Sequence, residues 1–390
     1  MEEIRTHRAP KTLVTGVGAA ARIGVAARQL GVTKALVLTD AGLAASGLVE
    51  QVERPLAEAG LPVDVYDGAV PEPPIGTIAE AVAKVEAGGY DCVVGFGGGS
   101  AIDVAKLAAV LAGSGRSAED LVGVDRAPRK AAAVLAVPTT AGTGSEVTAV
   151  AVLTNEKLNV RQGCVSPNLV PNVAVVDPLL TMTCPPGLTA SAGIDAFIHN
   201  VEAYISENAS LHTDPLARQG IELISRSLRV AVFQGNNVEA RHNMAMGSLL
   251  GGLAYGNAGV GAVHALSYPL GGRYHLQHGV ANGLMLPWVM EYNIPACLDY
   301  FWEIGEAMGE PLRDLSRREG AFKALEAMRQ LVADIGLPQY LSDVGIPESA
   351  VEELADGAMT QGRLLANNPR QLTRDEVVQI YRNAAVRPGA

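Results

Sequence analysis

The chain has 390 residues, more than one ordinary hydrophobic core holds, so its length predicts two domains. Apolar residues make up 48% of the chain and charged residues 18%, which is a globular composition, and only 4% of the residues are aromatic. The formal net charge of −11 argues against nucleic acid or an anionic membrane as the main partner.

The cysteines and the apolar stretches indicate in which compartment of the cell the protein is expected. The four cysteines, Cys92, Cys164, Cys184 and Cys297, form no CxxC pair, as is typical of isolated thiols in a reducing compartment. Residues 1–12 are polar and do not resemble a secretory signal. The most apolar stretch, residues 248–270, is interrupted by Asn257, His264 and several glycines, so we expect a buried helix and a turn there, not a membrane span. The sequence therefore predicts a cytoplasmic protein.

Strand and helix signals alternate along the first half of the chain. Residues 12–15, 35–39 and 62–66 are short β-type runs, and residues 77–87 carry apolar side chains at helical spacing. A buried strand at 92–96 precedes a glycine turn and a helix at 101–112, and a further strand follows at 134–137. This alternation predicts an α/β fold with a doubly wound parallel sheet.

The pattern changes near Pro185 and Pro186. Beyond them, residues 190–205 and most of the remaining chain have the periodicity of helices separated by Gly, Pro and Asn. We therefore expect an α/β domain in residues 1–186 and a helical domain in residues 187–390.

Two glycine-rich turns follow predicted strands. The first begins at Gly16 and fits a degenerate dinucleotide fingerprint, although a plain glycine turn that starts a helix explains so loose a match better. Asp40, downstream of it, ends a strand. Its carboxylate can accept hydrogen bonds from the ribose of NAD and repel the 2′-phosphate of NADP, or it can cap the next helix.

The second turn lies directly between the strand at 92–96 and the following helix, and consists of Gly97, Gly98, Gly99 and Ser100. Three residues without a Cβ let the backbone approach a pyrophosphate closely. The helix that follows directs free N–H groups and its positive dipole end at the same place. This turn therefore predicts the phosphate site.

A hydroxyl-rich loop follows the strand at 134–137, and its hydroxyl side chains are Thr139, Thr140, Thr143, Ser145 and Thr148. Ligands of open α/β sheets bind at the carboxyl ends of strands, so these hydroxyls can hold a nicotinamide amide, a ribose or a phosphate. The alternative is a polar loop with local side chain-to-backbone turns. The neighbouring glycine turn favours the cofactor role.

Four side chains in the second half have metal-ligand chemistry. Asp195 and His199 lie one helical turn apart beside an apolar stripe, so they can chelate one cation, although such pairs are also common on surfaces. His264 and His278 would be about 21 Å apart on a straight helix, but a proline and two glycines between them allow the chain to fold back. Three imidazoles and one carboxylate suit Fe²⁺ or Zn²⁺ better than Mg²⁺ or Ca²⁺.

Taken together, these segments resemble the iron-containing (group III) alcohol dehydrogenases over nearly the whole chain. The resemblance rests on the triple-glycine turn with Asp103 and Lys106, on residues 138–146 and 193–199, and on residues 264–282. It implies a nucleotide-binding domain, a helical metal-binding domain and an active site in the cleft between them. Dimers and larger homo-oligomers are common in this family.

The resemblance also implies roles for individual residues. It assigns the metal to Asp195, His199, His264 and His278, and the pyrophosphate to the triple-glycine turn rather than to the turn at Gly16. It makes Asp40 the residue that favours NAD. The cofactor contacts that we expect are Asp40, Gly97, Gly98, Gly99, Ser100, Asp103, Thr139, Thr140, Thr143, Thr148 and Arg161.

Three positions depart from the family pattern. Tyr268 stands where many relatives have a second histidine, so the proton relay falls to Tyr268 itself or to His275, which is otherwise a solvated loop residue. Arg161 stands where a lysine is usual near the cofactor. Val150 stands where diol-specific relatives have an asparagine, which favours an apolar substrate pocket.

These observations predict a metal-dependent alcohol dehydrogenase that transfers a hydride between NAD and a small alcohol or aldehyde, with Fe²⁺ or Zn²⁺ as a Lewis acid on the substrate oxygen. The first alternative is a hydroxyacid–oxoacid transhydrogenase, in which the cofactor stays bound. A lyase of the dehydroquinate synthase type would include Glu among its metal ligands, where this chain has Asp195. A non-catalytic binding protein would not need both cofactor segments and all four ligands.

Overall fold

The computed structural model describes residues 4–156 and 160–387 of the chain. They divide at Pro185 into two compact units. The N-terminal unit comprises residues 6–184, and the C-terminal unit comprises the described residues from Pro185 onward together with residues 4–5.

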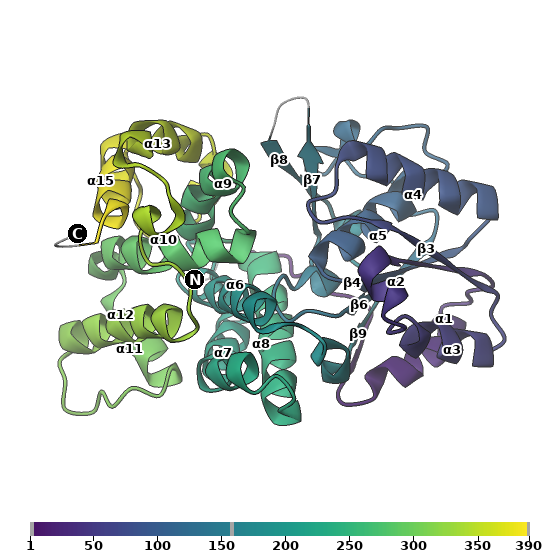
Figure 1. The fold of residues 1–390 in the computed structure, drawn as a ribbon, viewed down its shortest axis with the longest axis horizontal. Coiled ribbons are helices and arrows are strands. Elements are labelled where there is room, and N and C mark those ends of the chain that lie inside the picture. The colour runs from purple at the N-terminus through teal and green to yellow at the C-terminus, as the bar shows by residue number, and fades with distance from the viewer. Residues whose placement is uncertain (1–3, 157–159, 388–390) are drawn as a thin grey trace. The chain divides into compact units, whose positions relative to one another are not determined.

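The N-terminal unit is built on a parallel sheet of six strands (Figure 1). From edge to edge the strands are β1 (Thr12–Thr15), β9 (Val173–Val176), β6 (Ala133–Pro138), β4 (Cys92–Gly97), β2 (Ala35–Asp40) and β3 (Val63–Ala69). Every neighbouring pair in this sheet runs parallel. The α/β fold predicted from the strand–helix alternation is confirmed.

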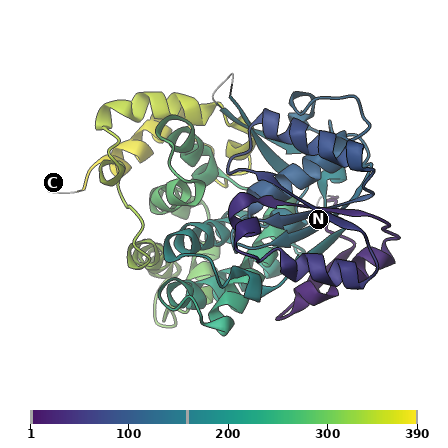
Figure 2. The same cartoon turned by 45° about the vertical axis from the view of Figure 1, so that its right-hand side comes forward.

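Alternate residues of the central strands enter two separate hydrophobic cores. Leu36 and Leu38 pack in the core under α4 (Ile75–Gly88) and α5 (Gly99–Leu111). Val37 packs in the other core, which includes α1 (Ile23–Gln29) and α3 (Glu50–Glu58). Figure 2 shows the strands of this unit between the helices of its two faces. Because both faces are buried, these strands are continuous apolar runs in the sequence.

The chain leaves β2 and β4 in opposite directions across the sheet. From β2 it passes through α2 (Ala41–Ala45) and α3 to β3, whereas from β4 it passes through α5 to β6 on the other side. Ligands of open α/β sheets bind outside the carboxyl ends of the strands at such a reversal. Here those two ends are Asp40 and Gly97.

A second sheet in this unit was not predicted from the sequence. Its strands are β5 (Gly123–Val124), β8 (Val160–Val165) and β7 (Val150–Asn155), and β7 and β8 are antiparallel. Burial alternates along β7, and the sequences of both strands in this pair include polar residues among the apolar ones. The strands predicted from the sequence all belong to the parallel sheet.

The described regular elements of the C-terminal unit are helices. The longer ones are α6 (Pro186–Tyr204), α7 (Asp214–Phe233), α8 (Val238–Ala258), α9 (Ala262–Tyr274), α10 (His278–Asn293), α11 (Leu298–Ala307), α12 (Arg317–Asp334), α13 (Val351–Met359) and α15 (Arg374–Ala385), with α14 (Gly362–Leu365) a single turn. Glycines allow α6, α7 and α8 to pack closely: a Cβ at Gly193 would lie 2.3 Å from Leu228 Cδ1, and one at Gly247 2.5 Å from Ile224 Cγ1. The helical C-terminal domain is confirmed.

Residues 248–270 correct one expectation. They are not a helix and a turn but the end of α8 and the beginning of α9, which are separated at residues 259–261. Pro269 does not end α9 either, because it is buried and packed against Gly357 of α13, and tertiary packing outweighs the lost hydrogen bond. No helix among the described residues is both long and apolar enough to span a bilayer.

Candidate metal centre and nucleotide-binding edge

Helix α6 supplies two of the predicted metal ligands. Asp195 and His199 are four residues apart, so they lie one above the other on one face of α6. Their exposed fractions are only 3% and 5%, which takes both side chains out of bulk water. An unpaired carboxylate in such a place is costly, so the site needs compensating charge.

The third and fourth predicted ligands begin two other helices. His264 lies in the first turn of α9, and His278 is the first residue of α10. Helix α9 rises about 15 Å between His264 and its end. The chain then turns at His275, whose φ is 55°, and residues 275–277 return toward the beginning of α9. The predicted reversal therefore occurs, at His275 rather than at Pro269.

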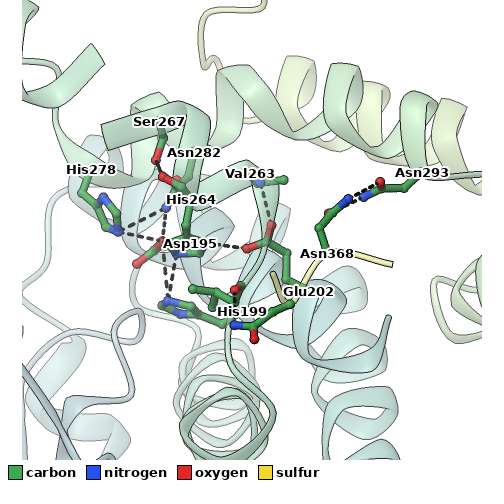
Figure 3. Close-up of polar contacts among 12 residues, drawn as sticks. Asp195, His199, Glu202, Val263, His264, Ser267, His278, Asn282, Asn293 and Asn368 are labelled. Atoms are coloured by element: carbon green, nitrogen blue, oxygen red, sulfur yellow. Dashed lines mark hydrogen bonds and ion pairs between the residues drawn. The ribbon is translucent and has the colours of Figure 1, made fainter. Parts of the chain in front are cut away.

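Three of the four predicted ligands converge on one point (Figure 3). His264 Nε2 lies 3.2 Å from His199 Nε2 and 3.6 Å from Asp195 Oδ1. His199 Nε2 lies 4.0 Å from Asp195 Oδ1. Donor atoms that bind one ion at about 2.1 Å in a tetrahedron are about 3.4 Å apart. The measured separations therefore fit a small divalent ion, and the mixed imidazole and carboxylate donors fit Fe²⁺ or Zn²⁺.

The fourth predicted ligand lies at the margin of this group. His278 Nε2 is 3.7 Å from Asp195 Oδ1, and its ring centre is 5.3 Å from that of His264. The side chain of His278 is 28% exposed, against 3% for His264. His278 is therefore within reach of the same ion, on the more open side of the cluster.

The charges of the cluster are strongly coupled. Burial by itself raises the pKa of Asp195, but the facing charges of His199 and His278 outweigh it and hold the pKa well below the usual range. Burial by itself lowers the pKa of His264, but Glu202 and Asp195 outweigh it and raise the pKa to about 9. Asp195 therefore stays anionic in the physiological range, as a metal ligand must.

Three residues of this site were missed in the sequence analysis as contributors. Asn282 Nδ2 donates to Asp195 Oδ1 at 2.7 Å, and the ring of Tyr255 stacks on His199 at 4.1 Å. Glu202 Oε2 lies 2.6 Å from His264 Nδ1. Helical spacing was the available signal for Glu202, because it follows His199 by three residues on the same face.

The two candidates for the proton relay differ in position. His275 is the exposed C-terminal cap of α9. The ring of Tyr268 is partly buried and lies 5.9 Å from the ring of His278, centre to centre. Tyr268 is therefore placed beside a predicted metal ligand, while the relay role stays a prediction for both residues.

In the N-terminal unit, the triple-glycine turn joins β4 to α5. A Cβ at Gly97 would lie 2.8 Å from Ala101 Cβ, and one at Gly99 would lie 2.7 Å from Thr143 Cγ2. At Gly98 the nearest atom is Thr140 Oγ1, at an ordinary 3.7 Å. Close packing against α5 and against Thr143 of the following loop therefore explains two of the glycines, whereas the fold itself does not require a glycine at Gly98.

The two glycine turns differ in the hydrogen-bond partners of their backbone N–H groups. In the first turn, Asp177 accepts from Gly18 N–H at 3.2 Å and from Ala20 N–H at 3.1 Å. This carboxylate would repel a phosphate. The second turn begins α5, and its N-cap is Gly98, which has no side chain of its own to cap the helix. Because the amides of the first turn are already bonded to a carboxylate, the second turn suits an anion better.

Asp40 ends the strand next to this turn. Its Oδ1 accepts from Leu43 N–H at 3.0 Å, so it caps α2. Its Oδ2 lies 3.9 Å from the position that a Cβ on Gly97 would take. The capping role and the ribose role were alternatives in the sequence analysis, and the geometry allows one oxygen for each.

A buried polar network ties α5 to the hydroxyl-rich loop. Lys106 Nζ donates to Ser145 Oγ at 2.7 Å, to Thr148 Oγ1 at 3.3 Å and to the Val150 carbonyl at 2.8 Å. Asp103 accepts from Ser145 Oγ and from Val152 N–H. Burial lowers the pKa of Lys106 to about 8 and raises that of Asp103. The side chains of Asp103 and Thr148 therefore form hydrogen bonds with other groups of the protein.

The remaining predicted cofactor residues lie around the glycine turn. Thr139 N–H donates to the Gly97 carbonyl at 2.9 Å, and Thr143 Oγ1 accepts from Ser145 N–H at 3.2 Å. Glu72 lies beside them: its N–H donates to Ser100 Oγ and its carboxylate pairs with Arg161. These contacts bring Ser100 and Arg161 to one acidic residue, which the sequence analysis did not single out.

Comparison with known proteins covers both units. Residues 10–178 match the family described as iron-containing alcohol dehydrogenase, and residues 189–385 match the C-terminal part of the Fe-containing alcohol dehydrogenase family. The chain is 46% identical over 372 residues to long-chain-alcohol dehydrogenase 1 of Geobacillus thermodenitrificans, covering 95% of this chain and 94% of that protein.

Further relatives extend this likeness. The chain is 40% identical to the 1,3-propanediol dehydrogenase of Klebsiella pneumoniae, covering 96% and 97% of the two chains. Among solved structures, a 1,3-propanediol oxidoreductase superposes with a TM-score of 0.95 at 39% identity, covering 98% of this chain and all of that one. An alcohol dehydrogenase of Oenococcus oeni gives a TM-score of 0.94 at 37% identity, with the same coverage. The chain belongs to the iron-containing alcohol dehydrogenase family.

Proposed function

We propose that this protein is an NAD-dependent alcohol dehydrogenase that uses one divalent metal ion, Fe²⁺ or Zn²⁺, on small alcohols or aldehydes. Metal-dependent alcohol dehydrogenase activity follows from the family. The observation that carries the proposal is the convergence of Asp195, His199 and His264, whose ligand atoms all lie within 4.8 Å of one another.

Each ligand residue has a separate task at the metal centre. Asp195 would supply a negative charge to a bound ion, and His199 and His264 would supply nitrogen donors on the buried side once the ion displaces their proton. His278, the more exposed of the four, would complete the ligand set. An ion bound by these residues would act as a Lewis acid on the oxygen of the alcohol or aldehyde. Asn282 keeps the Asp195 carboxylate in place through its hydrogen bond.

The triple-glycine turn and Asp40 would hold the nucleotide. Gly98, where a Cβ would meet only Thr140 at ordinary contact distance, and the beginning of α5 suit a pyrophosphate, and Asp40 suits a ribose with free hydroxyls. The turn is also flanked by Thr139, Thr140 and Thr143. Arg161 pairs with Glu72, which bonds to Ser100 of the turn. In this proposal Asp103 and Thr148 act indirectly, because their side chains hold the loop to α5 through Ser145 and Lys106. NAD supplies the hydride acceptor in alcohol oxidation.

The names of the relatives cover a wide range of substrates. They include a long-chain-alcohol dehydrogenase, 1,3-propanediol dehydrogenases, a methanol dehydrogenase and a lactaldehyde reductase. We propose a small substrate in an apolar pocket because Val150 carries no polar group for a second hydroxyl. Homodimerisation and a cytoplasmic location stay predictions.

A coupled assay tests the proposal. NADH formation or consumption is followed with a series of alcohols and aldehydes, using metal-free enzyme and enzyme loaded with Fe²⁺ or Zn²⁺. We expect turnover with free NAD only in the loaded enzyme. Full activity after complete chelation would contradict the metal proposal. A strict need for a second carbonyl substrate, without release of NADH, would instead support the transhydrogenase.

A further inference from the structure

Glu202 is a buried carboxylate whose two oxygens have different partners. It lies in the last turns of α6 and is 2% exposed. Its Oε1 accepts from Val263 N–H at 2.6 Å, and its Oε2 lies 2.6 Å from His264 Nδ1 (Figure 3). Both partners belong to the beginning of α9, so this one side chain links α6 to the turn that carries His264.

The contact between Glu202 and His264 places a proton on Nδ1 of the imidazole. A carboxylate oxygen accepts hydrogen bonds, so a short contact to Nδ1 requires the proton on Nδ1. In a neutral imidazole the other nitrogen, Nε2, then carries a lone pair. That atom is the one that faces His199 Nε2 and Asp195 Oδ1, at 3.2 and 3.6 Å.

We propose that Glu202 is a positioning residue for the metal centre: its carboxylate holds His264 in the Nδ1–H tautomer and in the orientation that presents Nε2 to the ion. The proposal rests on the metal centre of the proposed function. A carboxylate behind a metal-bound histidine also makes the imidazole a stronger donor. Glu202 bonds to the far nitrogen of His264, so it would act on a bound ion through that histidine.

Glutamine is an informative replacement because it has the size of glutamate but only one acceptor oxygen. Val263 N–H and His264 Nδ1–H both need an acceptor. In Glu202→Gln one of them would face the amide NH₂, so either the backbone bond is lost or His264 switches to the Nε2–H tautomer. Either change weakens the presentation of Nε2, and loss of such a partner costs roughly 10- to 100-fold in metal affinity.

The test compares zinc retention in three proteins: wild type, Glu202→Gln and Tyr204→Phe. Tyr204 is a matched control because it is buried on the same helix, and its hydroxyl bonds to Glu303 rather than to a ligand. Each Zn²⁺-loaded protein is titrated with a chromophoric chelator, and the thermal midpoint of each metal-free form is recorded. We expect Glu202→Gln to bind Zn²⁺ roughly 10- to 100-fold more weakly, with Tyr204→Phe unchanged.

A purely structural role for Glu202 predicts a different result: a lower thermal midpoint of the metal-free variant with zinc affinity retained. Zinc affinity within about twofold of wild type would therefore overturn the inference. If wild type itself bound no zinc, the proposed function would fail as well. If only the variant comparison fails, the metal centre stands and the role of Glu202 does not.

A measurement on wild type keeps the inference testable should Glu202→Gln fail to fold. In the Zn²⁺-loaded protein with ¹⁵N-labelled histidine, we expect a hydrogen-bonded Nδ1 proton on His264, assigned by its loss in His264→Asn. A His264 ring protonated at Nε2, or an Nδ1 without a proton, would overturn the inference.

Discussion

Gly98 is a position where a substitution can weaken nucleotide binding without disturbing the fold. A methyl group at Gly98 meets only Thr140 at ordinary contact distance, whereas one at Gly99 would overlap Thr143. We therefore expect Gly98→Ala to fold normally and to bind NAD at least tenfold more weakly, about 1.4 kcal/mol, because the methyl group fills the pyrophosphate space. The measurement is NAD binding by calorimetry beside the thermal midpoint of each variant.

Gly99→Ala is the matched comparison, with the overlap predicted to lower the thermal midpoint. Unchanged NAD affinity in a well-folded Gly98→Ala would place the pyrophosphate elsewhere.

Asp40 combines a structural role with the proposed choice of cofactor. Because it caps α2 through Oδ1, removing the whole side chain would confuse the two roles. Asp40→Ser keeps an N-cap oxygen and removes the charge. We expect the ratio of kcat/KM for NADP to that for NAD to rise at least tenfold, with little loss of stability. An unchanged ratio would exclude Asp40 from cofactor selection.

At the scale of single residues, the sequence predicted the metal ligands better than the residues that hold those ligands in place. Asp195 and His199 could be paired from helical spacing, His264 and His278 could be named as further candidates because the chain between them can fold back, and the resemblance assigned the metal to all four. Asn282 and Glu202 could not be given roles, because their partners Asp195 and His264 lie 87 and 62 positions away in the chain. Only the fold brings such pairs together.

At the scale of elements, the loop between β6 and β7 carries a buried acid that makes stability depend on pH. Burial raises the pKa of Glu146 from 4.5 to about 7. The folded protein therefore holds this proton more tightly than the unfolded chain, and the free energy of unfolding falls as the pH rises from about 4.5 to about 7. The full effect is about 3 kcal/mol.

Glu146→Gln removes this titration. We expect the variant to lose less stability than wild type between pH 5 and pH 8, as measured by urea unfolding at both values. The comparison between the two proteins isolates Glu146 from other groups such as Asp103, whose pKa is also raised. An identical loss in both proteins would show that Glu146 is not the titrating group.

Strands that alternate with helices could be predicted, whether buried like β4 or half-exposed like β3, and the β7–β8 pair could not. Strands β2, β4 and β6 are unbroken apolar runs, whereas β7 and β8 mix polar and apolar residues and pair locally. The proline inside α9 suggested a break where tertiary packing preserved the helix. Local signals thus failed where longer-range packing decides the outcome.

At the scale of the whole molecule, the two chemistries belong to different units of the chain. The metal ligands all lie beyond Pro185, and the triple-glycine turn and Asp40 lie before it. Composition and length predicted two domains, and the change of pattern near Pro185 indicated where one kind of architecture gives way to the other. A further consequence is that metal binding and NAD binding can be measured separately.

The most direct test of the account is a metal titration of the metal-free enzyme, with bound metal and turnover measured in the same samples. The account predicts that turnover rises in proportion to bound Fe²⁺ or Zn²⁺ and saturates at one ion per chain. It also predicts that His199→Ala binds no ion and does not turn over while still binding NAD, whereas the exposed His212→Ala behaves as wild type. Full turnover in the metal-free enzyme, or in His199→Ala, would contradict it.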